Sequence, residues 1–249
     1  MGKERIDVLL ARSGLAPSRE KARVLVMAGI VYANGQKVLK ADTRTDETAS
    51  LEIRGNPIPY VSFGGVKLKA AIDAFGIDVR GMKVLDVGSS TGGFTDCLLH
   101  EGARKIYAID SGTHQLHEKL RSDRRIILKE NFNARYLRFD DIGETVDMIT
   151  IDVSFISLKK IIPAVVGLVR KGGYVFSLVK PQFEVGRYNV GKGGIVKDDE
   201  RIKAVIDDIR EFGEGLGIKA LKIIEVPREK ERKNKEYFIV WEKLNGPTG

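Results

Sequence analysis

Cysteine and histidine are scarce in this chain of 249 residues. Cys97 is the single cysteine, and the histidines number three: His100, His114 and His117. One cysteine excludes an internal disulfide and a cysteine-rich metal site, and three histidines leave little material for a zinc centre. We therefore expect no bound metal.

Long hydrophobic segments are also missing. No apolar run approaches the roughly 20 residues that a membrane-spanning helix needs. The polar residues 1–5 are not followed by the apolar core of a secretion signal. A hydrophobic content of 43% still suffices for a buried core. We expect a cytoplasmic protein without a membrane partner.

Acidic residues are outnumbered by basic ones. The chain has 42 lysines and arginines against 34 aspartates and glutamates, which gives a formal net charge of +8. A positive protein attracts polyanions, either nucleic acid or an anionic membrane surface. Because many unrelated proteins are equally basic, the charge favours a nucleic-acid partner only together with other features.

The first part of the chain has the pattern of a small helical unit with a hairpin. A short helix ends near Gly14, and a second helix begins after Ser18, a favourable N-cap, and ends at Gly29. Asn34 and Gly35 separate two β-prone runs, and both residues tolerate the positive φ that a tight hairpin turn requires. These patterns predict an α+β domain.

A linker follows this unit. A last strand of the first domain is predicted over residues 51–53, and two prolines then occur within residues 55–59. Prolines disfavour a continuing helix. We therefore expect a first domain over residues 1–58, with a linker from about residue 55, and a second domain over residues 59–249.

The second domain alternates strands with helical segments. An amphipathic helix is clear after Asp198, and such alternation predicts a Rossmann-like, doubly wound and mostly parallel α/β sheet. The last two strands have no helix between them and are expected to form an antiparallel hairpin at the edge. The strands are predicted over residues 83–87, 105–109, 126–129, 148–152, 174–179, 220–226 and 237–241.

A glycine-rich loop follows the first of these strands. Glycines let the backbone turn sharply and approach a ligand closely, and open α/β sheets bind ligands at the carboxyl ends of their strands. Asp110 ends the next strand, where a carboxylate can accept hydrogen bonds from ribose hydroxyls. The predicted cofactor site comprises Asp110 and the loop residues Gly88, Ser89, Ser90, Thr91, Gly92, Gly93 and Phe94. The alternative is a tight turn beside a solvated aspartate.

Four charged residues suit the activation of a poorly acidic hydroxyl. Asp152 and Lys180 close two strands at the edge that carries the glycine loop, Lys67 begins the helix leading into the sheet, and Glu236 opens the final strand. We expect Lys180 to receive the hydroxyl proton, Lys67 to assist it or orient the hydroxyl, and the two acids to hold the lysines. Taken singly, each residue is better explained by a surface ion pair, and only the set of four favours a catalytic role.

Basic residues of the first domain could contact RNA phosphates. They crowd the start of the second helix and follow the hairpin turn, and phosphate contacts would give affinity with a steep salt dependence. The alternative is a solvated charged face. These residues are Arg19, Lys21, Arg23, Lys37 and Lys40. The glycine-rich residues 186–197 are interpreted as a mobile loop over the site or, equally, as a long surface connection.

The motifs around these residues closely resemble the TlyA family over residues 5–241. The most specific matches are residues 86–96, 152–158, 180–184 and 191–196. The resemblance implies an RNA-binding domain like that of ribosomal protein S4 fused to an FtsJ-like methyltransferase. It also implies S-adenosylmethionine as cofactor and 2'-O-methylation of cytidines in ribosomal RNA, with ribosomal RNA or ribosomal subunits as partners.

The resemblance also implies site residues. The family's catalytic tetrad maps onto Lys67, Asp152, Lys180 and Glu236, and its cofactor contacts extend to Asn131 and Asp152. One departure stands out, because Phe63 occupies a position where the family commonly has arginine. That puts in doubt any RNA or interdomain contact carried over to this position.

Three other functions are alternatives to RNA methylation. Members of the family are often labelled haemolysins, but a membrane-acting protein needs a spanning helix, an amphipathic cationic helix or barrel strands, and the sequence has no convincing one. A non-catalytic RNA-binding or ribosome-assembly factor would not need the tetrad. A small-molecule methyltransferase would not need the first domain.

Overall fold

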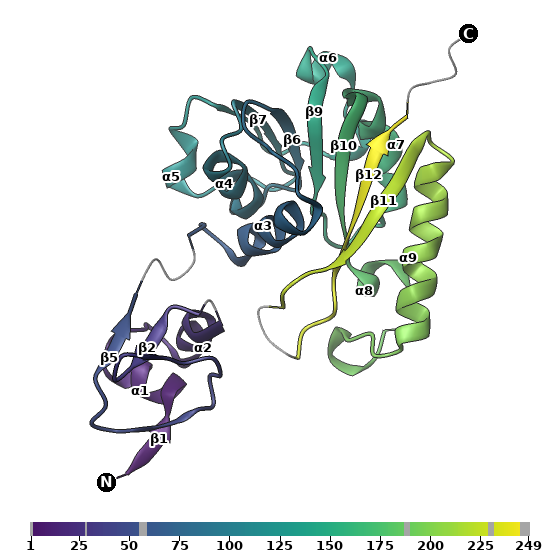
Figure 1. The fold of residues 1–249 in the computed structure, drawn as a ribbon. Coiled ribbons are helices and arrows are strands. Elements are labelled where there is room, and N and C mark those ends of the chain that lie inside the picture. Colours follow the sequence, from purple (N-terminus) through teal and green to yellow (C-terminus); the bar gives the residue numbers. More distant parts are fainter. Residues whose placement is uncertain (1, 28, 55–58, 187–189, 229–231, 245–249) are drawn as a thin grey trace. The chain divides into compact units, whose positions relative to one another are not determined.

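The computed structural model describes residues 2–27, 29–54, 59–186, 190–228 and 232–244. The chain divides into two compact units, residues 1–59 and 60–249, which are drawn in Figure 1. Each unit has its own buried core.

The first unit packs two helices against two small antiparallel sheets. One sheet pairs β1 with β4, and the other has the order β3-β2-β5. The core between them includes Ile6, Leu10, Ala22 and Val31. The elements are β1 (Lys3–Arg5), α1 (Ile6–Arg12), α2 (Arg19–Met27), β2 (Val31–Ala33), β3 (Gln36–Lys37), β4 (Arg44–Asp46) and β5 (Leu51–Ile53).

Local signals in this unit are confirmed. The Ser18 hydroxyl accepts a hydrogen bond from the backbone N–H of Lys21 at 3.2 Å, as an N-cap does. Asn34 and Gly35 form the turn between β2 and β3 with φ of 49° and 76°. The sequence analysis missed β1 and β4, which pair with each other, because strands of three mostly charged residues carry no alternating apolar pattern.

The second unit is a twisted sheet of seven strands in the order β11-β12-β10-β9-β6-β7-β8. The five strands from β10 to β8 are parallel, and β12 pairs antiparallel with both β10 and β11, which confirms the predicted edge hairpin. The strands are β6 (Lys83–Val87), β7 (Lys105–Ile109), β8 (Ile126–Lys129), β9 (Val146–Ile151), β10 (Val169–Val179), β11 (Ile218–Glu225) and β12 (Tyr237–Lys243).

Three of the predicted strands, β6, β7 and β8, have the predicted bounds. The prediction for β10 began too late, because an irregular stretch with Gly172 and Gly173 interrupts its pairing with β9 after Val169. The prediction for β9 ended one residue too late, so Asp152 follows the strand rather than closing it. Its backbone N–H still donates to the Val87 carbonyl at 2.9 Å, which keeps Asp152 beside the glycine loop.

Helices cover both faces of this sheet, as Figure 1 shows for α3 and α9. Leu68 of α3 and Leu98 of α4 pack with Phe238 in one buried cluster, whereas Ile206 of α9 packs with Trp241 in the other. The helices are α3 (Phe63–Phe75), α4 (Gly93–His100), α5 (Glu118–Arg121), α6 (Phe139–Ile142), α7 (Ile162–Val165), α8 (Pro181–Glu184) and α9 (Asp199–Glu214). In the described part of the chain, no helix has both the length and the apolar character needed to cross a membrane.

Candidate active site

The glycine loop joins β6 to α4 through a tightly bent backbone. Gly88 and Gly92 have φ of 84° and 95°, and Ser90 also has positive φ. A Cβ on Gly88 would lie 2.3 Å from the Asp152 carbonyl oxygen, and one on Gly93 would lie 2.2 Å from the Ser62 hydroxyl. The loop therefore needs glycine at these positions, because neighbouring atoms lie too close for any side chain.

Two adjoining cavities open at this loop, with volumes of about 290 and 360 Å³. Gly88, Ser90 and Asp152 line both of them. The first, here the central cavity, is also lined by Lys67 and Glu236. The second, here the acidic cavity, has walls that include Asp110 and Asp152 and, among the described residues, no lysine or arginine.

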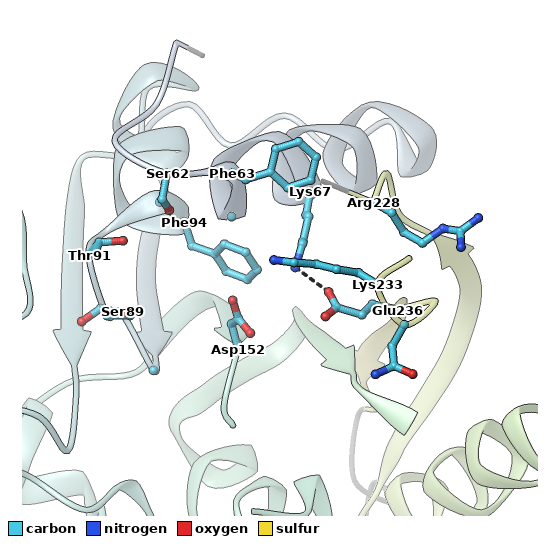
Figure 2. Close-up of a pocket in the computed structure, with 15 residues that line it drawn as sticks. Ser62, Phe63, Lys67, Ser89, Thr91, Phe94, Asp152, Arg228, Lys233 and Glu236 are labelled. Carbon is cyan, nitrogen blue, oxygen red and sulfur yellow. Dashed lines mark hydrogen bonds and ion pairs between the residues drawn. The ribbon is translucent and has the colours of Figure 1, made fainter. Parts of the chain in front are cut away.

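The four predicted catalytic residues form two ion pairs, and three of them, Lys67, Asp152 and Glu236, line the central cavity. Lys67 Nζ lies 2.5 Å from Glu236 Oε2, and Lys180 Nζ lies 2.5 Å from Asp152 Oδ1 and donates to Ser154 Oγ at 2.9 Å. The side chains are 12–21% exposed, so neither pair is a solvated surface pair. Figure 2 shows Lys67 and Glu236 facing each other above Asp152.

These residues come from distant parts of the chain. Lys67 is on α3 and Glu236 directly precedes β12, 169 residues later. Lys180 and Asp152 directly follow β10 and β9, which are neighbours in the sheet. Lys180 is not among the described residues that line either cavity, and it reaches the site through its contact with Asp152.

The predicted cofactor residues divide into lining and supporting positions. Asp110 lines the acidic cavity, and its carboxylate accepts the N–H groups of Ser90 at 2.7 Å and Gly112 at 2.6 Å. Gly92 lines neither cavity, because its backbone faces the side chains of Leu116 and Leu120. The other loop residues from Gly88 to Phe94 line the central cavity.

Asn131 also lies outside the described lining of both cavities. Its backbone N–H donates to the Gly112 carbonyl at 2.9 Å, and its φ is 54°. The two residues after it, Phe132 and Asn133, do line the acidic cavity. Asn131 is therefore part of the turn that positions Phe132 and Asn133. Spacing in the sequence cannot distinguish a residue that lines the cavity from one that lies one or two positions before it.

The residues fit a zwitterionic, ribose-containing cofactor. The Ser89 hydroxyl is buried in the wall of the central cavity, and among the described residues it has no hydrogen-bond partner. A buried hydroxyl without a partner is costly, so this one is suited to a polar ligand group. The closely approached glycine backbone and the Asp110 carboxylate supply further polar contacts.

Sequence reasoning missed several residues of the central cavity. Ser62 and Gly64 line it from the start of α3, and Arg228, Lys233 and Asn234 line it from the connection between β11 and β12. The connection is rich in charged residues. Charge is typical of any surface loop, so it does not indicate whether these side chains face the cavity or the solvent. Phe63 also lines the cavity.

The segment proposed as a mobile loop, residues 186–197, falls in part outside the described residues, since 187–189 are not described. Its described part contains a 3-10 turn, Lys192–Gly194. The Asn234 side chain donates to the Gly194 carbonyl and accepts from the Val196 N–H, both at 2.8 Å. This end of the segment is thus tied to a residue that lines the central cavity.

A buried acid, Asp86 of β6, joins the strand before the glycine loop to the helix after it. Asp86 is inaccessible to solvent and accepts hydrogen bonds from the hydroxyls of Thr95 at 2.6 Å and Thr150 at 2.9 Å. Burial raises its pKa to about 6, against the lowering effect of the two hydroxyls, and the charges of Asp152 and Asp110 add to the rise. Between about pH 4 and pH 6, the folded protein therefore holds a proton on Asp86 that the unfolded chain has released.

This proton predicts a pH-dependent stability. Because the folded pKa of Asp86 lies above its unfolded value of 3.8, the free energy of unfolding should fall as pH rises from about 4 to about 6. Asp86→Asn removes this term, which is on the order of 3 kcal/mol. Urea unfolding at pH 4 and pH 7 measures it: the stability of the wild type relative to the variant should be greater at pH 4. An equal difference at both pH values would contradict the assignment.

The predicted RNA-contacting residues of the first unit have different surroundings. Arg19 lies 3.4 Å from the buried carboxylate of Asp7, so it also supports the fold. Lys37 and Lys40 line a shallow cavity together with Lys3 and Arg44. Lys21 and Arg23 are exposed on α2. RNA contact by these residues stays a prediction.

Comparison with known proteins agrees with this architecture. Residues 60–243 match the family model of FtsJ-like methyltransferases, and residues 4–48 match the S4 domain. The Bacillus subtilis protein YqxC is 49% identical over 197 residues, which cover 79% of this chain and 70% of the relative.

Two further relatives cover nearly the whole chain. The Mycobacterium tuberculosis protein named 16S/23S rRNA (cytidine-2'-O)-methyltransferase TlyA is 41% identical over 237 residues, covering 94% of this chain and 88% of the relative. A solved structure from Streptococcus thermophilus, named a hemolysin, is 40% identical with a TM-score of 0.73, covering 99% of this chain and 90% of that one. The chain therefore belongs to the TlyA family, in which an S4 domain precedes an FtsJ-like methyltransferase domain.

Proposed function

We propose that this chain is an S-adenosylmethionine-dependent methyltransferase that modifies the ribose 2'-hydroxyl of cytidine in ribosomal RNA. The observation that carries the proposal is the meeting of two lysine–carboxylate pairs at the glycine loop. A sugar hydroxyl is a poor nucleophile because it holds its proton strongly, and lysines beside a cofactor loop suit the removal of that proton.

The cofactor would be held by the glycine loop and Asp110. Its ribose would meet the Asp110 carboxylate in the acidic cavity, and its polar groups would meet the loop backbone and the Ser89 hydroxyl. When bound, S-adenosylmethionine supplies an electrophilic methyl group on a positively charged sulfur. The carboxylates of Asp110 and Asp152 suit this positive charge, because opposite charges attract strongly in a partly buried site.

The chain's own residues would then prepare the hydroxyl. Lys180, held by Asp152 and Ser154, would accept the hydroxyl proton in its uncharged amine form, while the oxygen would bond to the methyl carbon and the bond from that carbon to sulfur would break. Lys67, held by Glu236, lines the central cavity and would orient the oxygen there. Positioning is the larger part of this task, because methyl transfer needs the oxygen in line with the methyl group.

An exposed aromatic ring supports a nucleotide substrate. Phe155 is 91% exposed at the rim of the acidic cavity, has a φ of 64°, and lies with its ring centre 5.0 Å from that of Phe183. A phenylalanine in this strained conformation and this exposed is unfavourable unless it serves a contact. Unpaired bases stack on such rings when RNA is recognised.

The substrate class follows from the relatives and the first unit. The cytidine and the ribosomal RNA come from the name of the Mycobacterium tuberculosis relative. The S4 domain, with its exposed lysines, is suited to hold structured RNA through phosphates. A ribosomal substrate would place the enzyme in the cytoplasm.

A labelling experiment tests the proposal. The protein is incubated with methyl-labelled S-adenosylmethionine and each purified ribosomal subunit, and the modified ribose is located by its resistance to alkaline cleavage. We expect label on a cytidine 2'-oxygen in at least one subunit. Label on a base, or no label on any RNA, would overturn the 2'-hydroxyl assignment.

A further inference from the structure

The loop between β7 and α5 borders both Asp110 and the glycine loop. This loop, residues 111–117, is here called the β7–α5 loop. Its Gly112 N–H donates to the Asp110 carboxylate at 2.6 Å, and its His117 N–H donates to the Thr91 carbonyl of the glycine loop at 3.1 Å. The position of the β7–α5 loop therefore affects two parts of the predicted cofactor site.

Side-chain packing joins the same two loops. Leu116 is buried, and a Cβ on Gly92 would lie 2.7 Å from its side chain and 2.4 Å from that of Leu120. The two loops thus pack closely. A displacement of the β7–α5 loop would reach the glycine loop, because close-packed groups transmit strain to their neighbours.

The carboxylate of Glu130 holds the β7–α5 loop. Glu130 directly follows β8, is not among the described residues that line the central or the acidic cavity, and accepts three consecutive backbone N–H groups. The donors are His114 at 3.1 Å, Gln115 at 2.7 Å and Leu116 at 3.1 Å. Successive N–H groups that converge on one point form a nest that favours an anion, and such a nest contains a left-handed residue, here His114 with a φ of 54°.

A cation completes the surroundings of Glu130. Arg121 Nη2 donates to Glu130 Oε1 at 2.7 Å and to Oε2 at 3.0 Å, and Arg121 Nε donates to the Leu116 carbonyl at 2.9 Å. Burial raises the pKa of Glu130, but the backbone N–H groups and the guanidinium outweigh it and lower the pKa to about 2. Glu130 is therefore ionised at neutral pH, and its hydrogen bonds are of the strong, charge-assisted kind.

We propose that Glu130 is a positioning residue for the ribose of the cofactor, an inference that rests on the proposed function. It fixes the β7–α5 loop so that the Gly112 N–H holds the Asp110 carboxylate in the wall of the acidic cavity, where ribose hydroxyls would donate to it. Glu130 acts through the loop and not by contact with the ligand. Its replacement should therefore weaken the recognition of the ribose hydroxyls and spare the transfer step once the cofactor is bound.

Two ligands that differ only in the ribose hydroxyls test this assignment. They are S-adenosylhomocysteine, the demethylated form of the cofactor, and its 2',3'-dideoxy analogue, and their affinities for the full chain are measured by calorimetry. The wild type should bind the dideoxy analogue about 100-fold more weakly, because Asp110 loses its hydrogen-bond donors. We call this ratio the hydroxyl effect.

Glu130→Gln should reduce the hydroxyl effect to about tenfold and change the affinity for the dideoxy analogue by less than about twofold. The reason is that an amide has one acceptor oxygen and would place its NH2 group against the donors of the nest. In the methylation reaction, the KM for S-adenosylmethionine should rise about tenfold with kcat nearly unchanged.

Two further variants connect the effect to the loop. In an Asp110→Ala background, Glu130→Gln should cause little additional loss of affinity for S-adenosylhomocysteine, since both changes remove the same contact. Arg121→Ala leaves the three backbone N–H groups on Glu130 and should reduce the hydroxyl effect in the same direction by a smaller factor, about threefold. Because Arg121 is partly exposed, this variant also tests the assignment if Glu130→Gln fails to fold.

Glu144→Gln is the matched control. Hydrogen bonds from Lys105, Lys83 and Tyr107 lower the pKa of Glu144 to about 2 as well. Lys83 and Lys105 begin β6 and β7, so Glu144 lies at the edge of the sheet opposite the cavities. The control should lower the unfolding temperature and leave the hydroxyl effect at its wild-type value.

The inference is overturned if Glu130→Gln retains the full hydroxyl effect. It is also overturned if this variant weakens the binding of both ligands equally, as general damage to the cavity would. A wild type without a hydroxyl effect would remove the ribose contact of Asp110 and the inference with it. Failure of the proposed function would appear separately, as an absence of ribose methylation by a wild type that shows the expected hydroxyl effect.

Discussion

Replacement of Lys180 by alanine is expected to reduce methyl transfer to RNA roughly 100- to 10,000-fold, the usual contribution of a group that accepts a proton in the reaction. Lys180 Nζ contacts Asp152 Oδ1 at 2.5 Å, and Asp152 lines both the central and the acidic cavity, so the lysine acts beside the reacting atoms. Label transfer from S-adenosylmethionine measures the loss, while RNA and cofactor affinities are measured separately and should be largely retained.

Lys159→Ala is the matched control for this experiment. Lys159 also forms an ion pair, at 2.5 Å from Asp208, but it lines neither cavity as described. Its removal should leave methyl transfer near the wild-type rate. If Lys180→Ala retains full activity, the proton acceptor is another group and the proposed role is wrong. A non-catalytic assembly factor would instead keep its biological role in the Lys180→Ala variant.

Replacement of Gly88 by alanine should be almost as damaging. The new Cβ would lie 2.3 Å from the Asp152 carbonyl oxygen, so the end of β9 must move away from the loop. The left-handed φ of 84° adds strain of about 1–3 kcal/mol. Because a displacement near 1 Å can cost about 100-fold in rate, we expect a loss of that size in methyl transfer and a lower unfolding temperature.

Gly81→Ala separates the effect of backbone strain from the effect of the close contact with Asp152. Gly81 has a similar φ of 73°, but no atom lies within 4 Å of the position of its Cβ. This control should show the backbone strain in its unfolding temperature and leave methyl transfer intact. Equal losses of activity in both variants would mean that the close approach of Gly88 to Asp152 has no special role.

The sequence predicted the second domain better than the first, for a physical reason. The strands β6 and β7 are apolar runs bounded by turns, and their burial inside the sheet makes the pattern strong. In contrast, β1 and β4 are short, charged and paired only with each other. Nothing in their local composition distinguishes them from loops.

The sequence alone predicted that the glycine loop, Asp110, Asp152 and Lys180 lie at one edge of the sheet, because the carboxyl ends of parallel strands lie at the same edge. Only the tertiary structure paired Lys67 with Glu236, because this contact joins two segments with no shared periodicity. Side-chain alternation and turn chemistry are local properties of the sequence. Which distant charges meet depends on how α3 and β12 pack around the sheet.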